Sequence, residues 1–284
     1  MAVLVVMLAI ALLAAPAVVP AQSAVEPRGA MLKIPMKEKG LFGGSRGLQL
    51  EATLFAAVAP GAPLLIFNHG STGAGRGSPT ETLTYPEVAR YFVERGFTVL
   101  VPMRRGRGAS GGDYLERYDC DTGALSAGLE RAIEDMDAVM AFVSRQPWAE
   151  RVPLLLGGMS RGGLLSIVYA STRPTGARGV INFAGGWTVE ACDQRIHYHE
   201  PTLAWAGRSA RVPMLWLYSE NDRNYGPVSV RSYHRAFTAA GGTADLEIFS
   251  PIGHDGHILL PRSVSVWASA VDAFLRRIGL GSSR

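Results

Sequence analysis

The stretch VPLLLGGMSRGG, residues 152–163, contains the feature that decides the fold. Its apolar run is short and continuous, which is typical of a strand buried on both faces of a parallel sheet. Two pairs of glycines follow, with Met159, Ser160 and Arg161 between them, and a helical pattern runs from about Ser160 to Ser171. Ser160 is therefore expected in a tight turn between a buried strand and a helix.

The same alternation of strand and helix continues through the chain. Strands are predicted at residues 48–58, 63–70, 97–102, 152–158, 179–185, 212–219 and 244–250, and helices at 82–96, 124–146, 160–171, 228–239 and 264–279. Such repetition requires a mostly parallel central sheet with helices on both faces, an α/β fold. No linker divides residues 27–284, so we expect a single domain, with residues 185–211 as a small cover over one end of the sheet.

The first 23 residues are apolar and uncharged in their side chains and end in Ala-Gln-Ser, small residues of the kind that precede a signal-peptidase cut. This pattern predicts a secretory signal peptide and a secreted or periplasmic protein. Because no Lys or Arg precedes the apolar run, an uncleaved membrane anchor is the alternative, and only then would the protein contact a membrane.

The composition indicates an ordinary globular protein, with 284 residues of which 48% are hydrophobic and 18% charged. The net charge is +4, and the arginines are scattered apart from the run Arg104-Arg105-Gly106-Arg107. We therefore expect no nucleic-acid partner.

Residues 158–162, Gly-Met-Ser-Arg-Gly, match the pattern G-x-S-x-G, in which a strained turn presents a nucleophilic serine. A helix N-cap serine is the alternative. A serine hydroxyl needs a histidine to remove its proton and a carboxylate to orient that histidine. Asp222 follows the strand predicted at 212–219, and His257 follows the strand predicted at 244–250. Ser160, Asp222 and His257 are therefore the predicted nucleophile, acid and base.

Each of the two partners has competitors nearby in the sequence. Glu220 and Asp193 are alternatives to Asp222, and His254 is the alternative to His257. The Asp255-Gly256 step predicts a turn that places His257 at the start of a helix, which favours it over His254.

An oxyanion formed at the serine needs two backbone N–H donors. Arg161, the residue after the serine, supplies one by position. The strand predicted at 63–70 ends in His-Gly, so the amide of Ser71 is the second candidate, with Gly70 the next choice. His69 is interpreted as a packed turn residue.

The segments NHGSTG, RRGRGASGG, GGMSRGG, YSENDRNYGP and PIGHDGHILL, in this order, give the chain a resemblance to the α/β-hydrolase superfamily, and within it to secreted dienelactone-hydrolase-like proteins. The resemblance implies hydrolysis of a carboxylic ester or lactone through an acyl-enzyme, without metal or organic cofactor. Its substrate would be a small molecule. Dienelactone hydrolases in the narrow sense use a cysteine nucleophile, whereas this chain has Ser160.

The fold also suggests a role for the two cysteines of the chain. Cys120 and Cys192 lie in loops that this fold places over the same end of the sheet. We therefore expect a disulfide between them, with two unrelated thiols as the alternative.

Several other patterns are weaker. Residues 106–111 fit the dinucleotide pattern G-x-G-x-x-G, but no helix is predicted to follow. Cys192, His197 and His199, with His254 and His257, do not have the spacing of a zinc site. Trp187 and Trp205 are candidates for the acyl pocket or for packing of the cover. Arg104, Arg105, Arg107 and Arg161 either attract a substrate carboxylate or are solvated on loops.

Two other functions fit the same pattern. One is a serine peptidase of the same fold, and the other is a binding protein that keeps the scaffold without catalysis. The short connections around the predicted site favour small or short-acyl substrates.

Overall fold

The computed structural model describes residues 29–39, 44–71, 80–114, 116, 121–187 and 195–281. The predicted signal segment and the predicted Cys120–Cys192 pair lie outside the described residues. Within these ranges no single helix has the length and apolarity needed to span a bilayer. The segments Gly256–Arg262 and Val264–Arg277 are bent by 65° relative to each other. Taken together they are long and apolar enough to pass the same test, which considers length and composition alone.

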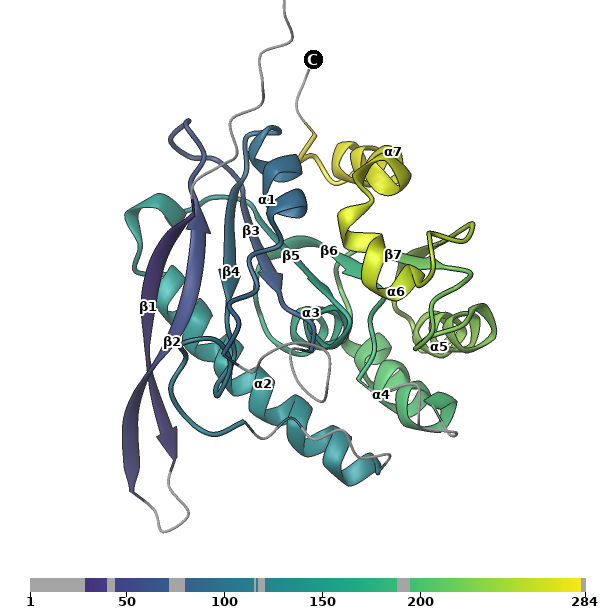
Figure 1. The fold of residues 1–284 in the computed structure, drawn as a ribbon, viewed down its shortest axis with the longest axis horizontal. Coiled ribbons are helices and arrows are strands. Elements are labelled where there is room, and N and C mark those ends of the chain that lie inside the picture. The colour runs from purple at the N-terminus through teal and green to yellow at the C-terminus, as the bar shows by residue number, and fades with distance from the viewer. Residues whose placement is uncertain are drawn as a thin grey trace, which may run out of the picture.

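An eight-stranded sheet in the order β1-β2-β4-β3-β5-β6-β7-β8 forms the centre of the molecule (Figure 1). The strands are β1 Ala30–Lys39, β2 Ser45–Phe55, β3 Leu64–Asn68, β4 Thr98–Pro102, β5 Leu154–Met159, β6 Ala177–Phe183, β7 Met214–Ser219 and β8 Ala244–Phe249. β2 runs antiparallel to both of its neighbours, and all the other pairs are parallel. The mostly parallel sheet agrees with the sequence analysis.

Helices cover both faces of this sheet. They are α1 Pro86–Val93, α2 Thr122–Val143, α3 Arg161–Thr172, α4 Arg195–Ser209, α5 Pro227–Ala239, α6 Gly256–Leu259 and α7 Val264–Arg277, with 3₁₀ turns η1 Pro147–Ala149 and η2 Leu260–Arg262. α1 and α7 pack together, whereas α2, α3, α4 and α5 follow one another on the other side (Figure 1). The fold is the α/β-hydrolase fold that the sequence predicts.

Strand β1 was not predicted from the sequence. It lies at the edge of the sheet, and only alternate side chains such as Ile34 and Met36 are buried. Ile34 pairs with Leu50 of β2 across an antiparallel ladder. The strand has no continuous apolar run and contains Pro35, a residue that sheets tolerate at their edges, so its sequence pattern is weak.

The helix predicted at 82–96 begins only at Pro86. Proline is well suited to the first turn of a helix, but it disfavours helical backbone at the residue before it. Residues 81–85 therefore form an irregular segment, and this segment lines the candidate site described below.

The connection at residues 185–211, predicted to be a cover over the sheet, contains helix α4 instead. α4 packs along α5 and also contacts α3, so its described part lies on a face of the sheet. A helix with apolar residues such as Leu203 and Ala206 is better buried on a neighbouring helix than exposed over an open site.

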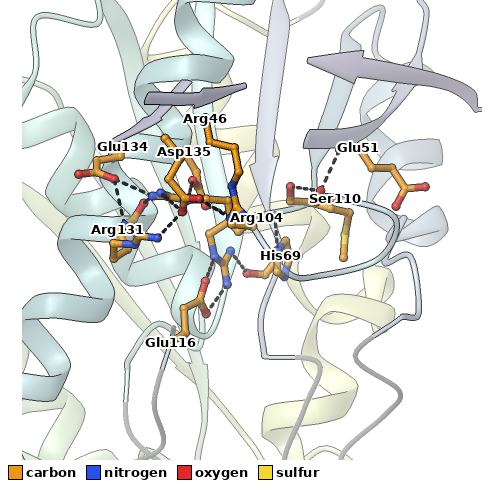
Figure 2. Close-up of polar contacts among 12 residues, drawn as sticks. Arg46, Glu51, His69, Arg104, Ser110, Glu116, Arg131, Glu134 and Asp135 are labelled. Atoms are coloured by element: carbon orange, nitrogen blue, oxygen red, sulfur yellow. Dashed lines mark hydrogen bonds and ion pairs between the residues drawn. The ribbon is translucent and has the colours of Figure 1, made fainter. Parts of the chain in front are cut away.

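A buried charge cluster joins β1, the end of β4 and α2 (Figure 2). The side chain of Arg105 is 3% exposed. It donates to Glu38 at 3.1 Å and to Glu134 at 2.8 Å, and its backbone N–H donates to Asp135 at 3.0 Å. Arg105 was expected either to attract a substrate carboxylate or to be solvated on a loop. It is instead buried among acidic partners from distant parts of the chain.

We predict that Arg105→Met lowers the free energy of unfolding by about 3–5 kcal/mol, because it leaves buried carboxylates without their cation. Arg173→Met is the matched control, since Arg173 and its partner Asp137 are 42% and 45% exposed. The control should change stability by no more than about 0.5 kcal/mol. Urea denaturation at pH 7 measures both, and equal effects would contradict the prediction.

Candidate active site

Ser160 lies in a strained turn at the carboxyl end of β5. Its backbone has φ 53° and ψ −120°, a conformation that residues other than glycine rarely adopt. The N–H of Ser160 donates to the carbonyl oxygen of Phe183 at 2.9 Å, and its carbonyl oxygen accepts from the N–H of Gly186 at 3.1 Å. Bonds to β6 and to the segment after it thus hold the strained residue in place.

The glycines around Ser160 are required by close packing of backbones. A Cβ atom at Gly158 would overlap the carbonyl group of Gly162, and one at Gly162 would overlap the backbone of Asn68. At Gly163 it would collide with the side chain of Asn182. Only a residue without a side chain fits at these three positions, which explains three of the four glycines in the two pairs.

The structure brings the three predicted catalytic side chains into one hydrogen-bonded row. Ser160 Oγ lies 3.1 Å from His257 Nε2, and His257 Nδ1 lies 3.0 Å from Asp222 Oδ2. The other carboxylate oxygen of Asp222 accepts from the N–H groups of Asn224 and Tyr225, both at 2.8 Å. With Asp222 ionised, Nδ1 of His257 carries the proton that bridges them, which leaves Nε2 able to accept the proton of Ser160.

The alternatives to these residues lie elsewhere. Glu220 and His254 are both exposed to solvent. Asp193 lies outside the described residues.

Asp255, which the sequence analysis treated only as a turn residue, holds the loops of the predicted acid and base together. Asp255 caps α6, and its Oδ1 accepts from the N–H of His257 at 3.0 Å and from that of Arg223 at 3.4 Å. The N–H of Gly256 donates to the carbonyl oxygen of Asn221 at 3.3 Å. An Asp two residues before the histidine, at the start of a helix, is the signal that could have identified this cap.

The segment that carries the predicted oxyanion donor is fixed by His69. The backbone N–H of Arg104 donates to Nε2 of His69 at 3.0 Å, so the ring proton is on Nδ1, which lies 2.6 Å from the carbonyl oxygen of Gly70. In a trans peptide the N–H points away from the carbonyl oxygen. The N–H of Ser71 is therefore directed away from His69, and Ser71 lines the same cavity as Ser160.

Gly70, the second choice for the oxyanion donor, uses its amide in another way. Its N–H donates to the hydroxyl oxygen of Tyr85 at 2.9 Å. Arg161 is the first residue of α3, where backbone N–H groups have no partner within the helix itself. This geometry favours Ser71 over Gly70 and is compatible with Arg161.

Buried ion pairs connect the two segments that carry the predicted oxyanion donors, Ser71 and Arg161. Glu116 accepts from the side chain of Arg104, which also donates to the carbonyl oxygen of His69 at 2.7 Å (Figure 2). Glu116 also lies 3.5 Å from Arg161. Burial alone would raise the pKa of Glu116, but Arg104 and Arg161 together hold it at about 2. Burial and the charge of Arg104 lower the pKa of His69 to about 3, so His69 is neutral.

Arg107 was also expected to attract a substrate carboxylate or to be solvated on a loop, and this expectation is wrong. Its guanidinium lies over the ring of Tyr114, 3.3 Å from the centroid, and the residue is buried. Arg104, Arg105 and Arg161 are buried in ion pairs. None of the four arginines is among the described residues that line the cavity at Ser160, and none is exposed to solvent.

A cavity of about 320 Å³ opens at Ser160 and His257. It is lined by Gly70, Ser71, Glu81, Thr82, Leu83, Thr84, Tyr85, Pro86, Glu87, Met159, Ser160, Asn224, His257, Ile258, Pro261 and Arg262. Its walls are thus the segment before α1 and the α6–η2 segment. The predicted cover at residues 185–211 contributes none of these described lining residues, and neither does the connection after β4 at residues 106–122.

Neither tryptophan proposed for the acyl pocket reaches this cavity. Trp187 is buried, and its backbone N–H donates to His199 Nε2 at 2.8 Å. Trp205 is 43% exposed on α4. The packing alternative therefore describes Trp187, and the acyl-pocket interpretation is wrong for both.

Comparison with known proteins agrees with this architecture. Residues 76–208 match the family model described as serine aminopeptidase, S33. The sequence matches no curated protein. Among solved structures, the esterase Pf2001 of Pyrococcus furiosus aligns with a TM-score of 0.63 at 15% identity, over 88% of this chain and 92% of its own.

Two further solved structures have the same fold. A putative dienelactone hydrolase from Klebsiella pneumoniae aligns with a TM-score of 0.53 at 18% identity, over 88% of this chain and 98% of its own. An acylaminoacyl peptidase of Pyrococcus horikoshii aligns with a TM-score of 0.60 at 18% identity, over 89% of this chain but only 42% of its own. At these identities the comparison establishes the shared fold.

We predict that His69 makes the protein less stable in acid. Its pKa falls from an ordinary value of 6.5 to about 3 on folding. Its contribution is complete above pH 6.5 and is lost as the pH falls toward 3, by about 1.4 kcal/mol per pH unit, because only the unfolded chain binds the proton. The difference in unfolding free energy between wild type and His69→Asn should therefore shrink from pH 7 to pH 4 in urea titrations. A difference that stays constant over this range would contradict the assignment.

Proposed function

We propose that this chain, which has the α/β-hydrolase fold, is a serine hydrolase that cleaves carboxylic esters or lactones through an acyl-enzyme. The hydrogen-bonded row of Asp222, His257 and Ser160 is the observation that carries this proposal. The strained backbone of Ser160 supports it further, because strain of this kind concentrates at functional sites.

The proposed reaction has two halves. Ser160 Oγ attacks the substrate carbonyl carbon while His257 Nε2 takes the hydroxyl proton, and His257 then passes this proton to the leaving alcohol as the ester bond breaks. In the second half, His257 removes a proton from water, and the hydroxide attacks the acyl-serine. The acid leaves, and the proton returns to Ser160. Asp222 stabilises the imidazolium in both halves.

The tetrahedral intermediate carries a negative charge on the former carbonyl oxygen. We assign its stabilisation to the N–H groups of Ser71 and Arg161, the first oriented by His69 and the second at the N-terminus of α3. The ion pairs of Glu116 with Arg104 and Arg161 hold these two segments in a fixed relation, so little reorganisation is needed as the charge develops.

The cavity favours a small substrate. Its volume of about 320 Å³ is near the lower end of the range of about 300–1,000 Å³ for small-molecule sites. Its apolar walls come from Leu83, Tyr85, Pro86, Ile258 and Pro261. Such a site suits a short or compact acyl group better than a long lipid chain.

A peptidase of the same fold is the second candidate. The match of residues 76–208 to the serine aminopeptidase model favours it. Both reactions use the same nucleophile and base, but an amine leaving group must be protonated more completely than an alcohol, so the relative rates on matched esters and amides separate the two.

The proposal also includes export of the protein and a disulfide between its two cysteines. The apolar residues 1–23 support export, and an exported protein would allow Cys120 and Cys192 to form a disulfide. The protein would then act outside the cytoplasm.

We predict that Ser160→Ala and His257→Ala each lower kcat on p-nitrophenyl acetate by about 10⁵-fold or more. His254→Ala should change kcat by less than about threefold, since surface substitutions away from a site have small effects. Ser263→Ala is the control for Ser160, because Ser263 follows the η2 turn but does not line the cavity, and its hydroxyl donates to Leu259 O at 2.9 Å. A wild type that binds esters without hydrolysing them would favour the binding-protein alternative.

We also predict that kcat/KM is highest for short acyl chains. In a long apolar groove, each additional buried methylene would stabilise the bound acyl chain by about 0.8 kcal/mol and raise kcat/KM about fourfold. The cavity is too small to bury the later methylenes of a long chain, so kcat/KM should stop rising. The measurement is a series of p-nitrophenyl esters from acetate to palmitate at constant detergent. A steady rise toward palmitate would refute the size argument, whereas p-nitroanilides cleaved faster than the matched esters would favour the peptidase.

A further inference from the structure

Tyr85 has a backbone conformation that its local sequence does not require. Its φ is 49° and its ψ 59°, in the left-handed region that bulky side chains rarely adopt. The residue stands at the N-cap of α1, yet its side chain makes no capping hydrogen bond. The strain therefore has a cause other than helix capping, and the contacts of the side chain identify it.

The conformation places the Tyr85 hydroxyl beside the nucleophile. The ring packs edge-to-face on Phe67, with centroids 4.9 Å apart. The hydroxyl oxygen accepts from the N–H of Gly70 at 2.9 Å. A Cβ built on Gly70 would lie 3.3 Å from Ser160 Cβ and 3.4 Å from the Tyr85 hydroxyl oxygen, so both groups border the same glycine.

The hydroxyl proton of Tyr85 has only a weak acceptor among the described residues. That acceptor is the sulfur of Met159, 3.7 Å away. A thioether is a poor acceptor compared with a charged oxygen. Tyr85, Met159 and Ser160 all line the cavity, so an anionic oxygen formed at the acyl carbon would be the stronger partner for this proton.

Tyr85 keeps its proton at neutral pH. Burial raises the pKa of its hydroxyl to about 12, against the opposing influence of the Gly70 N–H and of the charges of Arg104 and Arg262, while Glu81 raises it further. The group is therefore a hydrogen-bond donor across the whole working range.

We propose that the Tyr85 hydroxyl donates a hydrogen bond to the oxyanion of the tetrahedral intermediate, together with the N–H groups of Ser71 and Arg161. In this arrangement the Gly70 N–H does not contact the oxyanion directly. It donates to the Tyr85 oxygen and so polarises the O–H bond toward the substrate. The inference rests on the proposed function, since it needs an acyl substrate on Ser160.

Tyr85→Phe is the first test, because it keeps the ring on Phe67 and removes only the hydroxyl. We expect kcat to fall about 10²-fold with little change in KM, as for loss of one oxyanion donor. A kcat within about threefold of wild type would overturn the proposal. If Ser160→Ala abolishes hydrolysis while Tyr85→Phe does not reduce it, the role of Tyr85 is wrong and the proposed function stands.

The second test separates donation from structural support, because Tyr85→Phe also leaves the Gly70 N–H without its acceptor. A fluorinated tyrosine incorporated at position 85 keeps the oxygen but has a lower phenol pKa. Its phenolate still accepts from Gly70 but can no longer donate. In the pH profile of this variant, kcat should therefore begin to fall at a lower alkaline pH than in the wild type.

Fluorotyrosine at position 91 is the matched control for the pH profile. Tyr91 lies on α1, and its hydroxyl donates to Asp272 at 2.7 Å. This variant should follow the wild-type profile. The wild type and the two fluorotyrosine variants have the same titratable and charged groups around Tyr85. These groups are Arg104, Arg262 and Glu81, with His257 across the cavity. An unchanged alkaline limb in the position-85 variant would show that Tyr85 only supports the Gly70 backbone.

Discussion

The site depends on the close approach of three backbones where β5 meets α3. Gly158 and Gly162 pack against each other, and Gly162 packs on the backbone of Asn68 at the end of β3. This contact forces Ser160 into a left-handed conformation and holds its hydroxyl near the loops that follow β7 and β8. Without it, neither the row of Ser160, His257 and Asp222 nor the cavity beside it would have its present geometry.

A second constraint is the burial of Glu116 between two arginines. Arg104 comes from the end of β4 and contacts His69, whereas Arg161 begins α3. One carboxylate therefore links the two segments that carry the proposed oxyanion donors, Ser71 and Arg161. Buried ion pairs contribute little net stability, because desolvation offsets their attraction, so their use here is better explained by the fixed orientation that they impose on the backbone.

Comparable links hold the loops of the predicted acid, Asp222, and the predicted base, His257. Asp255 binds backbone N–H groups on both sides of the site, those of Arg223 and His257. The ring of Tyr225 packs edge-to-face on His257, with centroids 5.5 Å apart. The histidine thus approaches Ser160 from a loop held on two sides. Such support limits the imidazole to the orientation in which its two nitrogens meet Asp222 and Ser160.

The sequence by itself determined the alternation of strands and helices, the parallel sheet and the tight turn at Ser160. These features depend on residue type and spacing within a few positions, where sterics and apolar periodicity act directly. Edge strand β1 was not predicted because only one of its faces is buried, through Ile34, Met36 and Glu38. Tertiary structure alone decided that Arg104 and Arg105 are buried, because their partners Glu116 and Glu38 are set by the folded chain. It also brought Tyr85 beside Gly70, a contact between separate loops that no local pattern encodes.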